Sequence, residues 1–198
     1  MKPFSESCEQ NKQVILETIK PLLQNYRSVL EIGSGTGQHA VYFAQHMPHL
    51  QWQTSDRQEN IEGIQLWLEE AHLSNISSPL VLDVMQAEWP KLSVDAVFMA
   101  NTLHIMSWHD VEAFFSQISK VLEKNPSLII YGPFNYHGQY TSESNQRFDQ
   151  WLKSRDPNSG IKDFSEVNQL AEENQLKLVA DYEMPANNRI LYWKTKLS

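Results

Sequence analysis

Three glycines alternate with small polar residues directly after a short apolar stretch of the chain. Residues 29–32 read Val-Leu-Glu-Ile, and the loop that follows carries Gly33, Ser34, Gly35 and Gly37. Glycine permits a tight turn, and it lets the backbone approach a bound molecule because no Cβ stands in the way. These four loop residues are therefore candidate binding residues, and the expected chemistry is the seating of a bulky ligand against the backbone.

Acidic residues stand where they could meet the polar groups of such a ligand. Asp56, at the end of the next β-rich run, is placed to accept hydrogen bonds from ribose hydroxyls, and Asp83 after the third run could accept an adenine amino group. Each acid also fits a local role, because Asp56 and Glu59 have capping-box spacing and Asp83 could be a loop acid. Glu31 lies in a strand that should be buried, so it needs an opposing charge or hydrogen bonds. A cationic ligand or the loop's own backbone amides could supply them.

The glycine spacing separates the candidate ligand classes. A dinucleotide fingerprint, G-x-G-x-x-G, would require glycine at the position of Gln38, and neither a P-loop nor a G-x-S-x-G elbow occurs. The E-x-G-x-G-x-G of residues 31–37 instead resembles the first motif of S-adenosylmethionine-dependent methyltransferases. That resemblance implies a set of cofactor-binding residues: Glu31, Gly33, Ser34, Gly35, Gly37, Asp56, Asp83 and Asn101.

Candidate acceptor-site residues follow the fourth and fifth β-rich runs. In open α/β sheets, ligands collect beyond the carboxyl ends of the strands, which favours Asn101 and His104, then Asn135, Tyr136 and His137. His104 is the best candidate base because the ordinary pKa of histidine lies near neutrality. Its alternative role is to pack or cap between a strand and a helix. We predict His104, Asn101 and Tyr136 as catalytic residues.

Strand and helix patterns alternate along the chain and would bring these residues together. Apolar, β-rich runs predict strands, and three- and four-residue apolar spacing predicts helices. The expected strands are 28–32, 50–54, 80–82, 94–100, 128–131, 176–183 and 189–194, and the expected helices are 12–19, 40–47, one carrying Ile61 to Ala71, 107–123, one around Trp151 and one around Leu170. Alternation of this kind indicates a mostly parallel sheet with helices on both faces. The last two strands, joined by residues 184–188, should form an antiparallel hairpin.

Several longer motifs resemble a family of small methyltransferase-like proteins of unknown substrate. They are E-Q-N-K at 9–12, G-S-G-T-G-Q-H-A at 33–40, W-Q-T-S-D at 52–56, N-T-L-H-I at 101–105, G-P-F-N at 132–135, T-S-E-S-N at 141–145 and M-P-A-N-N at 184–188. The resemblance implies a Rossmann-like class I methyltransferase fold with a seven-stranded sheet in the order 3-2-1-4-5-7-6. It also implies S-adenosylmethionine as cofactor, and it implies no particular acceptor.

Composition limits the partners that we expect. The 198 residues carry a formal net charge of −8 without a clustered basic stretch, which argues against nucleic acid and against an anionic membrane surface. No apolar run is long enough to span a bilayer, and the lone Cys8 suits a reducing compartment. We expect one cytoplasmic domain over residues 1–198, with residues 1–27 forming an N-terminal helix and lid region.

Other features receive weaker expectations. Glu9, Asn11 and Lys12 could fold over the cofactor as part of that lid. His46 and His49 lack the further ligands of a metal site, so no metal is expected. By their helical spacing, Trp67, Trp151 and the aromatic residues of 108–115 are expected in the core. Asn187 and Asn188 are expected as turn residues, and residues 135–160 are expected to shape the specificity wall.

The sequence thus predicts an S-adenosylmethionine-dependent methyltransferase that acts by in-line transfer on a small-molecule acceptor. A protein acceptor stays open. The alternative is a non-catalytic module that binds the cofactor or a protein partner with the same fold. A nicotinamide-dependent oxidoreductase would need the glycine that Gln38 replaces.

Overall fold

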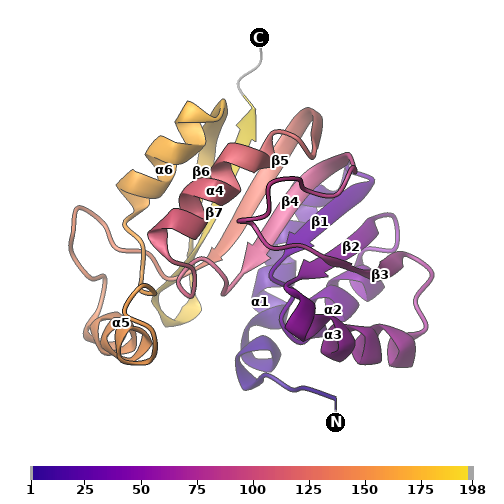
Figure 1. Ribbon diagram of the computed structural model, residues 1–198, viewed down its shortest axis with the longest axis horizontal. Helices are drawn as coiled ribbons and strands as arrows, with labels where there is room; N and C mark the ends of the chain where they lie inside the picture. The colour runs from indigo at the N-terminus through magenta and orange to yellow at the C-terminus, as the bar shows by residue number, and fades with distance from the viewer. Residues whose placement is uncertain (1, 196–198) are drawn as a thin grey trace.

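The chain forms one mixed seven-stranded sheet in the computed structural model, which describes residues 2–195, with residues 123–125 by backbone alone (Figure 1). The strands are β1 (Ser28–Ile32), β2 (Gln51–Asp56), β3 (Ile76–Val81), β4 (Val94–Ala100), β5 (Leu122–Gly132), β6 (Leu176–Met184) and β7 (Asn188–Thr195). Their order is β3-β2-β1-β4-β5-β7-β6, and only β7 runs antiparallel to its neighbours β5 and β6. This topology confirms the strand order and the C-terminal hairpin expected from the sequence.

Helices cover both faces of the sheet. They are α1 (Glu6–Leu23), α2 (Gln38–His46), α3 (Gln58–Ala71), α4 (Trp108–Ile118), α5 (Glu143–Arg155) and α6 (Phe164–Glu173), with a 3-10 turn, η1, at Pro185–Asn187. On one face, Ile15 of α1 and Phe43 of α2 pack with Phe98 of β4. On the other face, Phe114 of α4 and Val167 of α6 pack with strand residues such as Val97. Helix α3 lies next to α2 and contacts β2 and β3. None of the helices within residues 2–195 is long and apolar enough to cross a bilayer.

Helix α5 stands apart from these two layers. Figure 1 shows it beside the carboxyl ends of the parallel strands, where the amino end of α1 also lies. Its start is fixed by Ser142, whose side chain accepts a hydrogen bond from the backbone N–H of Asn145 at 3.1 Å. In open α/β sheets, ligands collect beyond the carboxyl ends of the strands, and here α1 and α5 border that region.

The helix expected over residues 107–123 is shorter than its apolar spacing suggested. The capping box of Ser107 and Asp110 starts α4, but the helix ends at Ile118. Leu122 continues the three- and four-residue pattern, yet it opens β5 and pairs with Val94 of β4. The prediction was wrong there because a residue beside the sheet core satisfies the same apolar spacing in either conformation.

Two other boundaries differ from the sequence-based expectation. The strand expected at 80–82 spans Ile76–Val81, and its Ser77 and Ser78 lie at the open edge of the sheet, where the apolar signal is weak. The helix expected at 12–19 begins at Glu6, because Ser5 caps it by accepting from the backbone N–H of Cys8. The earlier start of α1 places its first turn over the loop that follows β1.

Candidate functional site

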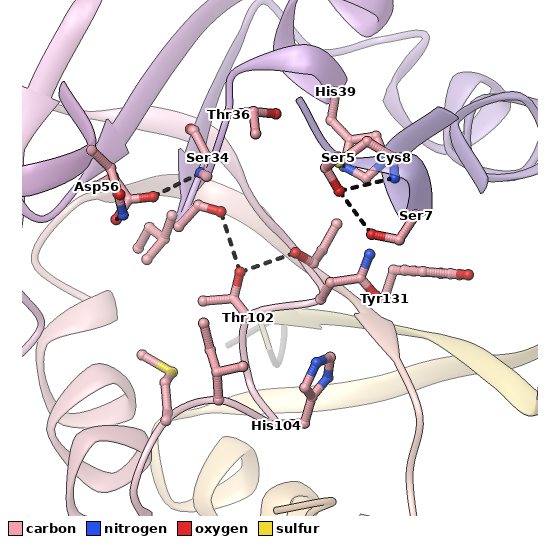
Figure 2. A pocket seen from close by; sticks show the side chains of 18 of the residues that line it. Ser5, Ser7, Cys8, Ser34, Thr36, His39, Asp56, Thr102, His104 and Tyr131 are labelled. Carbon is pink, nitrogen blue, oxygen red and sulfur yellow. Dashed lines mark hydrogen bonds between the residues drawn. The ribbon is translucent and has the colours of Figure 1, made fainter. Parts of the chain in front are cut away.

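A cavity of about 1240 Å³ opens at the carboxyl ends of the parallel strands. Its walls come from the glycine loop after β1, from the loops after β2, β3 and β4, and from the N-terminal segment with the first turns of α1. Helix α5 and the β6–β7 turn close the other end. Figure 2 shows the polar side chains that point toward this space. The cavity thus brings together most of the residues that the sequence predicted as a site.

The glycine loop is held by the neighbouring strand. Gly33, Gly35 and Gly37 all have positive φ angles, of 73°, 60° and 89°. The backbone N–H groups of Gly33 and Ser34 both donate to the Ser55 carbonyl at 3.0 Å. A Cβ added at Gly35 would meet nothing within 4 Å, so this part of the backbone faces open cavity. Gly37 lies behind it, as the N-cap of α2.

Asp56, which was expected to accept hydrogen bonds from ribose hydroxyls, holds the glycine loop in place. Its Oδ2 accepts from the backbone N–H of Gly35 at 2.7 Å, a bond drawn in Figure 2. Its Oδ1 accepts from the backbone N–H of Arg57 at 2.7 Å and from Asn60 Nδ2 at 2.8 Å. Arg57, and not Asp56, is the N-cap of α3. Each carboxylate oxygen carries about two acceptor positions, so one position on Oδ2 is left for a ligand.

Glu31 is buried directly beneath the loop and does not line the cavity. It is 2 % exposed, and its Oε2 accepts from Trp52 Nε1 at 3.0 Å and Ser34 Oγ at 3.1 Å. These side-chain donors replace the backbone amides that the sequence suggested. Burial raises the pKa of Glu31 to about 7, although both hydrogen bonds lower it. A carboxyl group with this pKa would become fully ionised if a cation came near.

Asp83 and Asn101 both line the cavity. Asp83 Oδ1 accepts from the backbone N–H of Met85 at 2.9 Å, which is the local loop role considered from the sequence. Asn101 has a φ of 56°, a left-handed conformation that asparagine tolerates. Its Nδ2 is buried and finds no hydrogen-bond partner among the described residues. An unpaired buried donor is costly, so a ligand atom that accepts a hydrogen bond at this point would remove that cost.

His104 belongs to the loop after β4 and lines the cavity (Figure 2). Its ring meets Phe148 edge to face, with 5.2 Å between ring centroids. Burial, with the nearby Lys162 cation as the next cause, lowers the pKa of His104 to about 4. The imidazole is therefore neutral at pH 7 and can accept a hydrogen bond, but it holds a proton weakly.

Tyr136 is not brought to the cavity. Its hydroxyl donates to Asp181 Oδ2 on β6 at 2.7 Å, and its ring stacks on Phe164 with 5.2 Å between centroids. Burial, with the Asp181 carboxylate as the next cause, raises the pKa of Tyr136 above its ordinary value. Asn135 and His137 also lie outside the cavity lining. The chain turns away from the cavity after Pro133, which removes these residues from the acceptor side.

The N-terminal segment covers one side of the cavity. Ser5 and Gln38 bond reciprocally, since the Ser5 N–H donates to Gln38 Oε1 at 2.6 Å and Gln38 Nε2 donates to the Ser5 carbonyl at 3.3 Å. Glu9 accepts from the same Nε2 at 3.0 Å, and Asn11 Oδ1 accepts from His39 Nε2 at 2.7 Å. Gln38, which excluded a dinucleotide motif, thus anchors this segment to the end of the glycine loop.

The two histidines considered for a metal bind backbone instead. His46 Nδ1 donates to the Tyr42 carbonyl at 2.7 Å, and His49 Nε2 donates to the Leu23 carbonyl at 3.2 Å. Within residues 2–195, no group of three or more His, Cys, Asp or Glu side chains could hold a metal ion.

Sequence reasoning missed part of the cavity wall, because Tyr131 and Thr102 line it and neither was singled out as a site residue. Asn145 and Phe148 also line it, and both fall within residues 135–160, which were expected to shape the specificity wall. Trp151 was expected in the core, but it is 49 % exposed and lines the cavity, so that prediction was wrong. Of the two turn asparagines, Asn187 has the expected positive φ of 57°, whereas Asn188 begins β7 and reaches the cavity. The T-S-E-S-N motif at 141–145 was a usable signal, since it ends on Asn145.

Comparisons with known proteins agree with this geometry. A family model described as "Protein of unknown function (DUF938)" matches residues 2–195. Among similar solved structures, the S-adenosylmethionine-dependent methyltransferase SibL in its apo form has a TM-score of 0.81 at 18% identity, over 96% of this chain and 56% of its own. An O-methyltransferase family protein from Burkholderia thailandensis has a TM-score of 0.78 at 10% identity, over 95% of this chain and 59% of its own. Human N-acetylserotonin methyltransferase in complex with S-adenosylmethionine has a TM-score of 0.76 at 14% identity, over 97% of this chain and 53% of its own. The chain spans little more than half the length of these proteins. At such identities, the likeness shows the class I methyltransferase fold.

Proposed function

We propose that this chain, which belongs to the family of proteins of unknown function DUF938, binds S-adenosylmethionine and transfers its methyl group to a small-molecule acceptor. One observation carries the proposal. An E-x-G-x-G-x-G loop, with left-handed backbone at all three glycines, faces a large cavity at the carboxyl ends of the strands. The solved structures that share the fold of this chain include a methyltransferase in complex with this cofactor.

The residues present fit such a cofactor. Five carboxylate residues line the cavity, Asp56, Glu59, Glu62, Asp83 and Asp110, against the single guanidinium of Arg57. An excess of carboxylates favours a ligand with sulfonium and ammonium charges and disfavours a pyrophosphate. The open space above Gly35 and the unpaired Nδ2 of Asn101 supply, respectively, room for a ligand and a donor for a carboxylate.

Each of the predicted cofactor residues has a distinct proposed role. Asp56 would accept from a ribose hydroxyl through its remaining Oδ2 position, and Asp83 would face the adenine amino group. The backbone of Gly33, Ser34 and Gly35 would lie against the amino-acid part, with Glu31 as the buried countercharge. Gly37 would act indirectly, because it shapes the turn into α2.

Methyl transfer needs little covalent chemistry from this chain. The cofactor, when bound, supplies a methyl group already activated on a sulfonium. The protein orients the acceptor and excludes water, and orientation alone can contribute about 7–11 kcal/mol to lowering a barrier. His104 would hold the acceptor next to Asn101, whose Nδ2 would bind the cofactor. The low pKa of His104, about 4, suits a hydrogen-bond acceptor better than a group that keeps the released proton.

Calorimetric titration tests the proposal directly. We expect the purified protein to bind S-adenosylmethionine and S-adenosylhomocysteine with dissociation constants in the micromolar range, about −8 kcal/mol, and to show no heat of binding with NADH. Micromolar binding of NADH, with no heat of binding for S-adenosylmethionine or S-adenosylhomocysteine, would refute the proposal. Binding of the sulfur ligands without methyl transfer to any compound of a metabolite extract would favour the non-catalytic module instead.

The N-terminal segment is proposed to act as a lid, and its removal should weaken cofactor binding. Lys2 Nζ pairs with Glu70 Oε2 at 2.7 Å, and the Pro3 carbonyl accepts from Trp67 Nε1 at 2.7 Å, which fastens the segment to α3. Deleting residues 2–4 keeps the Ser5 cap of α1 and should lower cofactor affinity about fivefold to tenfold, since roughly one buried hydrogen bond is lost. Glu70→Gln, which cuts only an exposed ion pair, should change affinity less than twofold. Equal affinity of the truncated and full-length proteins would contradict the lid.

A further inference from the structure

We propose that the methyl acceptor is a flat, uncharged or cationic aromatic compound whose hydroxyl or amino group is held between α5 and the loop after β4. This inference rests on the proposed function, since it names the substrate class for the same cavity. Three features of this end of the cavity carry it: an aromatic wall, an exposed apolar rim and one oriented amide oxygen. The net charge of the whole cavity lining adds a fourth argument.

The aromatic wall is built by α5 against His104. Phe148 and Trp151 stack nearly parallel, with 5.8 Å between their ring centroids and an interplanar angle of 17°. The His104 ring stands at 73° to Phe148, at 5.2 Å. Aromatic rings prefer partners in such offset-stacked and edge-to-face arrangements. A flat aromatic guest would therefore extend an arrangement that the three rings already form.

The rim beside this wall exposes apolar side chains that a folded protein would otherwise cover. Trp151 is 49 % exposed and Ile105 is 50 % exposed, and both line the cavity. The Arg155 guanidinium lies 4.8 Å from the centre of the Trp151 ring, but Arg155 is not part of the lining. Apolar surface gathered in a concave place is typical of small-molecule sites. A ligand with its own apolar faces would remove this surface from water.

Asn145 adds one polar contact with a fixed direction. It is 5 % exposed and lines the cavity, and its Nδ2 donates to Thr141 Oγ1 at 2.9 Å and to the Asn187 carbonyl at 3.1 Å. Both amide hydrogens are thereby used, which fixes the amide with Oδ1 as its acceptor. Among the described residues, nothing donates to that oxygen. A ligand hydroxyl or amino group would fit there, whereas a carbonyl or carboxylate would meet a second acceptor.

The net charge of the cavity lining disfavours anionic acceptors. The lining holds five carboxylate residues and Arg57 as its one cationic residue. Lys162 lies close by, but its Nζ already donates to the carbonyls of Met106 at 2.7 Å and Gly160 at 2.8 Å. Of these carboxylate residues, Asp110 alone follows β4, whereas the other four belong to the end of β2, to α3 and to the loop after β3. The net charge of the whole lining therefore disfavours a carboxylate or phosphate on the acceptor, but not a neutral or cationic compound.

The transfer balances with the groups present. The acceptor's oxygen or nitrogen lone pair forms the new bond to the methyl carbon, and the carbon–sulfur bond breaks with its electron pair going to sulfur. The proton lost by the hydroxyl or amino group passes to water, directly or through a hydrogen bond to the neutral His104 imidazole.

Calorimetry with four probes, at saturating S-adenosylhomocysteine, tests the substrate class. We expect 2-naphthol and 2-naphthylamine to bind at least tenfold more tightly than 2-naphthoate and cyclohexanol. Trp151→Ala should weaken 2-naphthol binding at least fivefold, and Trp151→Phe should restore most of it. Val179→Ala, at an exposed position on β6 outside the cavity lining, is the control and should bind as the unaltered protein does.

The two levels of the proposal fail separately. If S-adenosylhomocysteine itself does not bind, the proposed function is wrong, and the acceptor class is wrong with it. If it binds, but the four probes bind alike or Trp151→Ala leaves 2-naphthol affinity unchanged, only the aromatic acceptor is overturned.

Discussion

Replacing Asp56 with asparagine is expected to weaken S-adenosylmethionine binding about 100-fold. The carboxylate holds Gly35, Arg57 and Asn60 in one network, and its remaining acceptor position faces the cavity. An asparagine NH₂ in place of Oδ2 would oppose both the Gly35 N–H and a ribose hydroxyl, and in place of Oδ1 it would oppose the Arg57 N–H and Asn60 Nδ2. Hydrogen bonds to charged groups contribute about 1.5–3 kcal/mol each, and about 1.4 kcal/mol corresponds to a tenfold change in affinity. Loss of one or two such bonds gives the expected effect, measured by calorimetric titration.

Glu59→Gln is the matched control for this substitution. It removes the same charge from the same cavity lining three residues later, but the Glu59 side chain is 65 % exposed and meets only Arg57, at 3.8 Å. Its effect on affinity should stay below about threefold because exposed charges are screened. Equal losses in the two variants would mean that only the overall charge of the cavity matters, and Asp56 would lose its assigned role.

The glycine-loop side of the cavity was predictable because its signals are local. A strand, a glycine loop and an acid at the end of the next strand follow one another within residues 28–56. Parallel pairing of β1 with β2 then brings Ser55 and Asp56 to the loop without further information. Turn chemistry and the carboxyl ends of parallel strands sufficed for this half of the cavity.

The α5 side of the cavity depends on contacts between residues far apart in the chain. Phe148 meets His104 across 44 positions, and Asn145 reaches the Asn187 carbonyl across 42. Helical spacing could not separate Trp151 from a core residue, since a cavity wall and a core both demand an apolar stripe. Tyr136 looked available after β5 because nothing near it in sequence announced its bond to Asp181. Tertiary packing, not local pattern, decides these positions.

Replacing Gly33 with alanine is expected to destabilise the fold severely. Its φ is 73°, which costs an L-residue about 1–2 kcal/mol. The added Cβ would also lie 2.4 Å from Thr102 Cγ2 and 2.6 Å from its Oγ1. Thr102 has little freedom to yield, because its hydroxyl donates to the carbonyls of Ala100 and Gly33. With about 1–3 kcal/mol for overpacking, the sum is roughly 2–5 kcal/mol. A melting temperature lower by about 5–15 °C is expected in calorimetric unfolding.

Gly35→Ala separates the fold from ligand binding at the same loop. Its φ of 60° carries a similar conformational cost of about 1–2 kcal/mol, but its Cβ would meet no atom within 4 Å. The variant should therefore melt only a few degrees lower than the unaltered protein. Its new methyl group would stand in the space proposed for the cofactor, so S-adenosylmethionine affinity should fall at least tenfold. If Gly35→Ala bound the cofactor normally while remaining folded, the cofactor would not lie against this loop, and the proposed assignment of Gly33, Ser34 and Gly35 would be wrong.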